Sequence, residues 1–262
     1  MMDWFSGAIG LKTVAVLGWF VILFVAERLR PADVTGKPLH TATTTGLARM
    51  GRNAALWAIN TAMAPLIVVP ITVLAADHTL WRPFWWGGPL GLALDILLFD
   101  FLIYWWHRAN HEFPFLWRFH SVHHFDATLD TTTAVRFHFG EVALAALARA
   151  GVIVLIGFPL VSVFTFEALI LIASLFHHSN VRFPVKLEAA LSRIFITPSI
   201  HWVHHHAIKS DTDSNYGTIF SFWDPLFATR SKTRRQSGMP IGVQGGHEQG
   251  LGALLLHPFK AG

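Results

Sequence analysis

The sequence predicts an all-α integral membrane protein, with about four to five transmembrane or re-entrant helices and a histidine-rich helical cap on the cytoplasmic side. Hydrophobic residues make up 53% of the 262 residues and charged residues only 14%, which is unusual for a water-soluble domain. Several apolar runs approach the length of about 20 residues that one helical crossing needs. Tryptophans gather at the edges of these runs, as in "LWRPFWWGG" (80–88), where indole rings favour the membrane–water boundary.

The first two predicted spans lie in the N-terminal third of the chain. Residues 8–26 form an apolar run that begins without a basic segment and ends at "ERLRP", so they indicate an uncleaved anchor rather than a signal peptide. Residues 54–76 form the second run. Pro65 and Pro70 within it predict a bend, because proline cannot donate the backbone hydrogen bond of a straight helix.

The third span, residues 88–106, leads directly into His107. The next apolar run, 142–178, is interrupted by "GFP" at 157–159. It is too long for one crossing of about 20 residues and slightly short for two, so we expect a helical hairpin that spans or re-enters the membrane. We interpret the chain as a single membrane domain with three parts: N-terminal anchor spans (1–87), a histidine-cluster catalytic core (88–230) and a cytoplasmic C-terminal tail (231–262).

Basic residues predict the orientation of the spans. With a hairpin at 142–178, three groups of Lys and Arg lie on one side of the membrane, opposite Lys12 and Arg82. The positive-inside rule makes that side the cytoplasm, in a multi-pass protein of a bacterial inner membrane. The net charge of +4 then marks a basic membrane face, and no recognition helix or basic–aromatic motif indicates nucleic-acid binding. The groups are Arg28, Arg30, Lys37, Arg49 and Arg52; Arg108, Arg118 and Arg136; and Arg182, Lys186, Arg193, Lys209, Arg230, Lys232, Arg234, Arg235 and Lys260.

Four histidine clusters stand at or beyond the ends of spans on that side. They read HxxxH, HxxHH, HH and HxxHH, so their spacing places several rings on one helix face. The chain has no cysteine, which leaves imidazole, the commonest metal ligand at neutral pH, as the main donor. Eight or more imidazoles exceed the four ligands that one zinc ion takes and predict two metal ions. The clusters are His107 and His111; His120, His123 and His124; His177 and His178; and His201, His204 and His205.

Spacing alone does not name the metal, because nitrogen-rich sites suit iron, copper, nickel and zinc. A metal store or a pH-sensing patch would also gather histidines, but such tracts are usually of low complexity and lack regular helical spacing. A two-zinc membrane lipid hydrolase would need a carboxylate base near a metal-bound water, and the sequence has no HExxH-like arrangement. A non-enzymatic membrane metal-binding protein, such as a transporter, would place its ligands near the membrane midplane rather than at span ends.

The motifs around these histidines resemble the fatty acid hydroxylase/sterol desaturase superfamily, over about residues 95–259. The matching stretches are "HRANH", "LWRFHSVHH", "FHHSNVRFP" and "TPSIHWVHHH", followed by "NYG" (215–217) and "FWDPLFATR" (222–230). The resemblance implies a non-haem di-iron centre in the membrane that activates O2 to hydroxylate or desaturate a lipid, and the lipid expected is fatty-acyl or sterol-like. Zinc is expected as a substitute metal in a purified sample.

The resemblance also implies which side chains bind the two irons. The expected ligands are His107, His111, His120, His123, His124, His201, His204 and His205, with one more from the pair His177 and His178. Members of the superfamily often carry "RxHPxE", whereas this chain has "RFHFGE" (136–141), with Phe139 in the proline position. His138 is therefore a metal ligand, a residue that supports the ligands or a purely structural residue, and of these we favour the supporting role.

Other polar residues near the motifs are expected to support the site or the fold. Asp100 lies two helical turns before His107, a rise of about 10 Å, which is too far for direct contact. Metal-bound histidines usually donate their second ring N–H to a carboxylate or carbonyl. The nearby acids that are candidates for that role are Glu112, Asp126, Asp130, Asp211, Asp213 and Asp224, several of which we expect to be simply solvated loop charges. Glu112 is either such a supporting acid or a charge at the water boundary. The remaining supporting residues are Asn180, His206, Asn215 and Asp224.

The expected partners are a lipid substrate, the bilayer and an external electron donor, either a ferredoxin or a small haem carrier with its reductase. No "HPGG" haem-binding signature is present in the chain, since "HPFK" (257–260) is not one. The basic segment "RSKTRR" (230–235) would attract an acidic carrier, although positive-inside bias explains the same charges.

Overall fold

The computed structural model describes residues 2–33, 44–246 and 248–260, so Lys37 of the first basic group lies outside the described residues. Within these residues, five helical segments are long and apolar enough to cross a membrane, which confirms the predicted all-α membrane fold with four to five spans. They are α1 (Met2–Leu29), the continuous stretch of α2 (Thr44–Met63), η1 (Ala64–Val68) and α3 (Val69–Asp77), α4 (Gly88–Glu112), α6 (Phe139–Ile156) and α7 (Leu160–His178).

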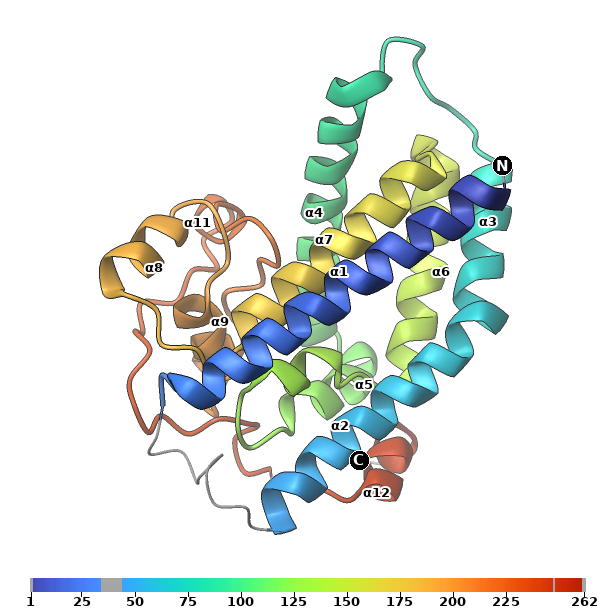
Figure 1. Cartoon of the computed structure of the whole chain (residues 1–262). Coiled ribbons are helices and arrows are strands. Elements are labelled where there is room, and N and C mark those ends of the chain that lie inside the picture. Colours follow the sequence, from blue (N-terminus) through green and yellow to red (C-terminus); the bar gives the residue numbers. More distant parts are fainter. Residues whose placement is uncertain (1, 34–43, 247, 261–262) are drawn as a thin grey trace.

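The second span is one continuous helical segment that contains a π-helical turn. Pro65 stands at the start of η1 and Pro70 at the start of α3, and a widened turn accommodates the ring and the missing N–H of proline. Figure 1 shows this helical segment bending between α2 and α3, as the two prolines predict.

The hairpin predicted at 142–178 is formed by α6 and α7. Its turn depends on Gly157, which ends α6 in the left-handed conformation with φ 76°. A Cβ at this position would also overlap the backbone carbonyl of Trp81, so only glycine fits. Because the hairpin returns the chain to the side where α4 ends, the last two histidine clusters join the first two.

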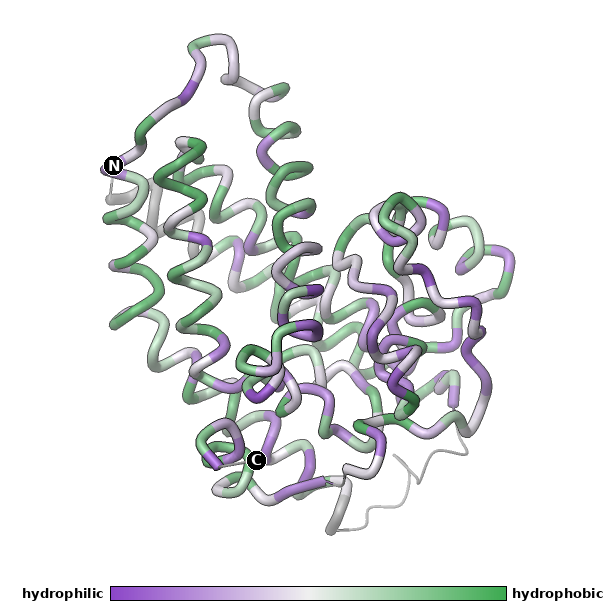
Figure 2. The backbone as a smooth tube through the Cα atoms, turned by 180° about the vertical axis from the view of Figure 1, so that it is seen from behind, coloured by the Kyte–Doolittle hydropathy of each residue, from purple (hydrophilic) through white to green (hydrophobic). Residues whose placement is uncertain are grey.

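Apart from η1, the short helices that the structure describes gather at the end of the bundle where α1, α4 and α7 finish, and we call this part the cap. Figure 1 shows it at the left and along the bottom, and Figure 2 shows hydrophilic segments concentrated there while the long helices are mostly hydrophobic. The cap helices are α5 (Pro114–His124), η2 (Thr131–Val135), α8 (Val185–Leu191), α9 (Pro198–His204), α10 (Lys209–Thr212), α11 (Trp223–Leu226), α12 (Leu251–Leu256) and η3 (His257–Phe259).

Asp95 and Glu167, two acids inside the spans, are paired with basic residues, which lowers the cost of placing a charge in a membrane. Asp95 binds Arg82 through both carboxylate oxygens, at 2.9 and 3.1 Å. Glu167 binds Lys12 at 2.6 Å and Arg149 at 3.1 Å. These pairs tie α1, α6 and α7 together, and they fasten the loop before α4 onto that helix.

Candidate metal centre

Nine histidines form two compact groups in the part of the chain that the structure describes. In each group, one ring nitrogen from every member lies within 4.8 Å of those of the others. All nine are buried except His107, which is half-buried. The first histidine group is His107, His111, His120, His124 and His204, and the second histidine group is His123, His178, His201 and His205.

The repeated HxxHH spacing divides each helix between the two groups. In α5, His120 and His124 are four residues apart and join the first group, whereas His123 joins the second. At α9 the division is reversed. His204 belongs to the first group, whereas His201 and His205, the residue just after the helix, belong to the second. A helix whose ligands stand at i, i+3 and i+4 can contact both groups at once, because these positions lie on one face.

Several ligand rings are fixed by an acceptor on the Nδ1 atom. A carbonyl or carboxylate oxygen can only accept, so Nδ1 carries the hydrogen and Nε2 presents its lone pair. This choice of tautomer and ring orientation is the one that a metal ion on Nε2 requires. The contacts are His107 to the Tyr216 carbonyl (2.9 Å), His123 to the Arg136 carbonyl (3.1 Å), His178 to the Ser174 carbonyl (2.8 Å), His204 to the Ser214 carbonyl (2.7 Å) and His120 to Glu141 Oε1 (2.7 Å).

Ring nitrogens of the histidine groups also lie close to one another or have no hydrogen-bond partner among the described residues, as expected for nitrogens that bind a cation. In the second group the Nε2 atoms of His178 and His201 lie 3.0 Å apart, and those of His201 and His205 lie 3.1 Å apart. In the first group, buried ring nitrogens of His111 and His124 have no hydrogen-bond partner among the described residues. Buried polar atoms without a partner are costly, and a metal ion in each group would satisfy these nitrogens.

The protonation state also suits metal binding. Burial, followed by the proximity of other imidazoles, lowers the pKa of five cap histidines well below the usual value of 6.5. These rings are therefore neutral at pH 7, which is the form that binds a metal. They are His123, His124, His201, His204 and His205.

The structure separates the two histidines of the "FHHSN" motif. His178 belongs to the second group and is held by the Ser174 carbonyl. His177 is buried, and its ring centroid lies 4.0 Å from that of His201, but it belongs to neither group. The geometry thus favours His178 as the donor of the pair.

His138 and His206 lie outside both groups. Nδ1 of His138 accepts a hydrogen bond from the Gly140 backbone N–H, and Nε2 donates to the Leu255 carbonyl, so the ring caps α6 and holds α12. His206 bonds Asp211 through Nδ1 at 2.8 Å. Both are placed to support the cap, and neither ring joins a histidine group.

Asp224 and Asn215 support the segment that holds His107. Asp224 accepts hydrogen bonds from the backbone N–H groups of Tyr216 and Gly217, and the Tyr216 carbonyl in turn receives His107 Nδ1. Asn215 adopts a left-handed conformation with φ 53° and donates to the carbonyl of Ile200 in α9. The "NYG" motif therefore links α4 to α9.

Asp100 and Asn180 fasten cap segments to the spans. Asp100 accepts hydrogen bonds from the backbone N–H groups of Ile219 and Phe220 and from the Trp223 indole. Asn180 accepts from the backbone N–H groups of Ala32 and Asp33, which joins the ends of α7 and α1.

Glu141 was not among the acids expected near the ligands. It accepts the His120 Nδ1–H at 2.7 Å, although 21 residues separate the two in the chain. The signal was present in the final residue of "RFHFGE", which follows His138 by one turn of α6. Glu112, by contrast, is exposed and pairs with Arg108 at 2.7 Å, as a charge at the water boundary does.

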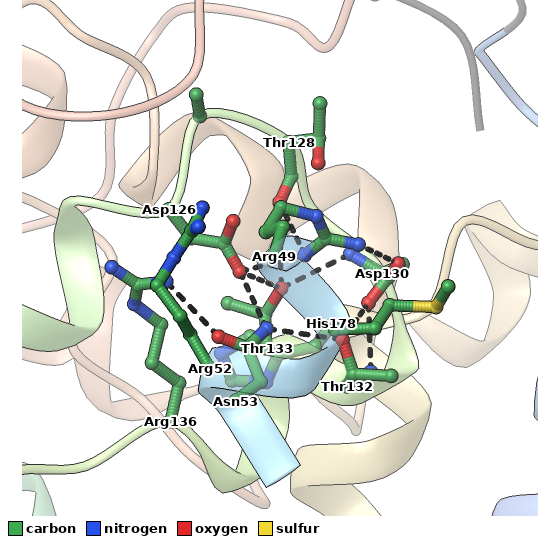
Figure 3. Close-up of polar contacts among 12 residues, drawn as sticks. Arg49, Arg52, Asn53, Asp126, Thr128, Asp130, Thr132, Thr133, Arg136 and His178 are labelled. Atoms are coloured by element: carbon green, nitrogen blue, oxygen red, sulfur yellow. Dashed lines mark hydrogen bonds and ion pairs between the residues drawn. The ribbon is translucent and has the colours of Figure 1, made fainter. Parts of the chain in front are cut away.

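A buried ionic network supports the loop that follows α5. Arg49 of α2 binds Asp126 and Asp130, and Figure 3 shows these side chains converging with Asn53. Arg136 donates to the Asn53 side chain and to the Val122 carbonyl, and its own carbonyl accepts His123 Nδ1. The network thereby connects the second span to the second histidine group.

The chain is similar to a known protein family and to several known proteins. The sequence model of a family described as fatty acid hydroxylase matches residues 92–229. Ornithine lipid hydroxylase OlsE of Rhizobium tropici is 29% identical over 262 residues, which cover 98% of this chain and 76% of that protein. A cholesterol 25-hydroxylase-like protein of Danio rerio is 30% identical over 62% of this chain and 67% of its own length.

An alkylglycerol monooxygenase of Caenorhabditis elegans is 30% identical over 161 residues, which cover 60% of this chain. The match spans only 30% of that relative's length. No solved structure matches the chain.

Proposed function

Because the chain belongs to the fatty acid hydroxylase family, we propose that it uses O2 and external electrons to hydroxylate a C–H bond of a membrane lipid at a non-haem di-iron centre. Its membership makes it an oxidoreductase of the multi-pass membrane type. The observation that carries the proposal is the pair of adjacent all-imidazole groups, which stand where the spans meet the cap.

In this proposal the first histidine group holds one iron and the second holds the other, with His178 rather than His177 as the ligand from α7. Bound iron would supply the redox chemistry that lets O2 attack an unactivated C–H bond. The chain's own residues hold the rings in place through Glu141 and the backbone carbonyls described above. Burial of the groups excludes bulk water from the reacting carbon.

The substrate proposed is a polar membrane lipid. Both histidine groups lie at the ends of spans, so the attacked carbon should lie near the polar end of the lipid, with its tail between the long helices. A relative that matches 98% of this chain is named for ornithine lipid, and aminolipids are therefore the first candidates. Sterol-like and ether lipids are the next candidates, because other relatives are named for cholesterol and alkylglycerol. Their names favour hydroxylation over desaturation.

Electrons would reach the site from the cap side. We place this side in the cytoplasm because Arg28, Arg30, Arg49 and most other basic residues lie there. Arg230, Lys232 and Arg234 are exposed in the tail and would meet an acidic carrier, whereas Arg235 is engaged with Glu188 at 3.1 Å.

The alternative functions are less well supported. A two-zinc hydrolase requires a carboxylate base that is free to take a proton from a metal-bound water. The carboxylates next to the first histidine group already face ring nitrogens: Glu141 accepts the His120 Nδ1–H, and Asp213 lies 3.6 Å from His111 Nδ1. A metal transporter would place ligands near the midplane, whereas these lie at span ends.

Comparative lipidomics tests the proposal. A bacterium that makes aminolipids is analysed with and without the chain, and with His123→Ala as the control variant. We expect a lipid one oxygen atom heavier that depends on the intact chain and is absent with His123→Ala. The proposal would be overturned if no lipid gained an oxygen atom when the intact chain was present.

A further inference from the structure

Two arginines face each other beside the junction of α1 and α7. Pro31 and Val181 form an antiparallel β-bridge, and on one side of it the Arg182 N–H donates to the Arg30 carbonyl at 2.8 Å. Residues directly opposite in an antiparallel pair project their side chains from the same face. The bridge thus places Arg30 opposite Arg182, and two guanidinium groups on the same face of the bridge give this surface a positive charge that attracts an anion.

The two arginines line a groove of about 570 Å³, within the size range of small-ligand sites. The rest of its lining is apolar and comes from Leu29, Pro31, Phe183 and Pro184, so Phe183 and Leu29 contribute hydrocarbon next to the charges. A groove that combines two guanidinium groups with apolar walls suits an amphipathic anion.

No carboxylate neutralises this pair within the described residues. Neither Arg30 nor Arg182 has a side-chain hydrogen bond or ion pair there, and both are exposed. Arg28, in the same turn as Arg30, is by contrast engaged with Glu27 and the Phe24 carbonyl. The segment 34–43, "VTGKPLHTAT", contains no Asp or Glu, so it has no acid to supply.

The groove lies at the membrane boundary. The candidate span of α1 ends at Leu29 and that of α7 ends at His178. Leu29 is 76% exposed and Val185, just beyond the groove, is 83% exposed, as expected for side chains that contact lipid. Arg182 follows His178 by four residues, a chain length of about 13 Å at most.

We propose that Arg30 and Arg182 bind the anionic headgroup of a membrane lipid, through its phosphate or carboxylate, while its acyl chain extends beside α1. Guanidinium groups recognise both anions with paired hydrogen bonds. The proposal concerns binding and stands whether or not the chain oxidises that lipid.

The test is native mass spectrometry of the full chain in detergent, titrated with phosphatidylglycerol or with phosphatidylcholine of the same acyl chains. The test variant is Arg30→Gln with Arg182→Gln. The matched control, Arg118→Gln with Arg193→Gln, removes the same charge from exposed arginines of the cap side. Elution as a single monodisperse peak and unchanged iron content check the fold of each variant.

We expect the unmodified chain to prefer phosphatidylglycerol, the test variant to lose about tenfold in its affinity, and the control to keep it within about twofold. Arg30→Lys with Arg182→Lys should still prefer phosphatidylglycerol over phosphatidylcholine, because charge is preserved, but it should bind more weakly than the unmodified chain because the paired hydrogen bonds are lost. If the test and control variants lost the same amount of affinity for phosphatidylglycerol, the lipid would be attracted by the overall positive charge of the protein, and the proposed site would be overturned. If an equal concentration of glycerol phosphate displaced the lipid, the site would bind free phosphate esters rather than a membrane lipid, and the proposal would be overturned.

Discussion

His123 and His178 face each other through their Nε2 atoms at a distance of 3.1 Å. Nδ1 of His123 donates to the Arg136 carbonyl and Nδ1 of His178 donates to the Ser174 carbonyl, so neither Nε2 carries a hydrogen. Two lone pairs that face each other in a buried place repel unless a cation lies between them. This pair supports the proposal that the second histidine group binds a metal ion.

The two histidines at the end of α7 should therefore differ in metal binding. His178→Ala should lower the iron content by about one ion per chain, because it removes a ligand from a group of four. His177→Ala is the matched control and should retain both irons. The measurement is elemental analysis of protein purified without oxygen, and the reverse pattern would contradict the assignment.

Glu141 should act on metal affinity through His120. Glu141→Gln weakens the acceptor that fixes the His120 ring, and loss of such a partner typically costs about 10- to 100-fold in metal affinity. Glu112→Gln should leave affinity unchanged, because Glu112 is exposed and pairs only with Arg108 among the described residues. Chelator competition measures both. Equal affinities for the two variants would show that Glu141 does not position the ligand.

The hairpin turn should not tolerate a side chain. Gly157→Ala forces a left-handed alanine and a contact with the Trp81 carbonyl, so we expect the free energy of unfolding to fall by about 2 kcal/mol or more. Gly151→Ala, in the interior of α6 with open space around it, should be neutral or stabilising by up to about 1 kcal/mol. Thermal unfolding in detergent compares them, and a Gly157→Ala variant as stable as Gly151→Ala would refute the account of the turn.

The ionic network of Figure 3 should be essential to the cap. Arg49→Ala leaves Asp126 and Asp130 buried without their cation, and breaking a buried pair typically costs about 3–5 kcal/mol. Arg52→Ala removes a half-buried pair with Glu248 and should cost about 1 kcal/mol or less. Limited proteolysis of the cap reports the difference, and equal protection of both variants would contradict it.

Much of this architecture was predictable because its signals are local. Apolar runs such as 88–106 report a span directly, and "GFP" at 157–159 marks the place where the hairpin turns. The histidine spacing indicated ligands because positions three and four apart share a helix face.

The division of ligands between two groups was not predictable in the same way. That His123 joins His205 rather than His120 depends on how α5 crosses α9, which is a tertiary relationship. Glu141 was missed for the same reason, since its partner His120 is distant in the chain. Asp100 was judged too far from His107 for contact, and the structure gives it a different role, as an acceptor for the segment 219–223.

Isotopically labelled O2 tests the central claim most directly. Purified chain with two irons, a reductant and an aminolipid substrate is supplied with labelled O2 in unlabelled water. The account predicts one labelled oxygen atom in the product lipid, and none when His123→Ala replaces the intact chain. Product oxygen that comes from water, or turnover without O2 and iron, would contradict it.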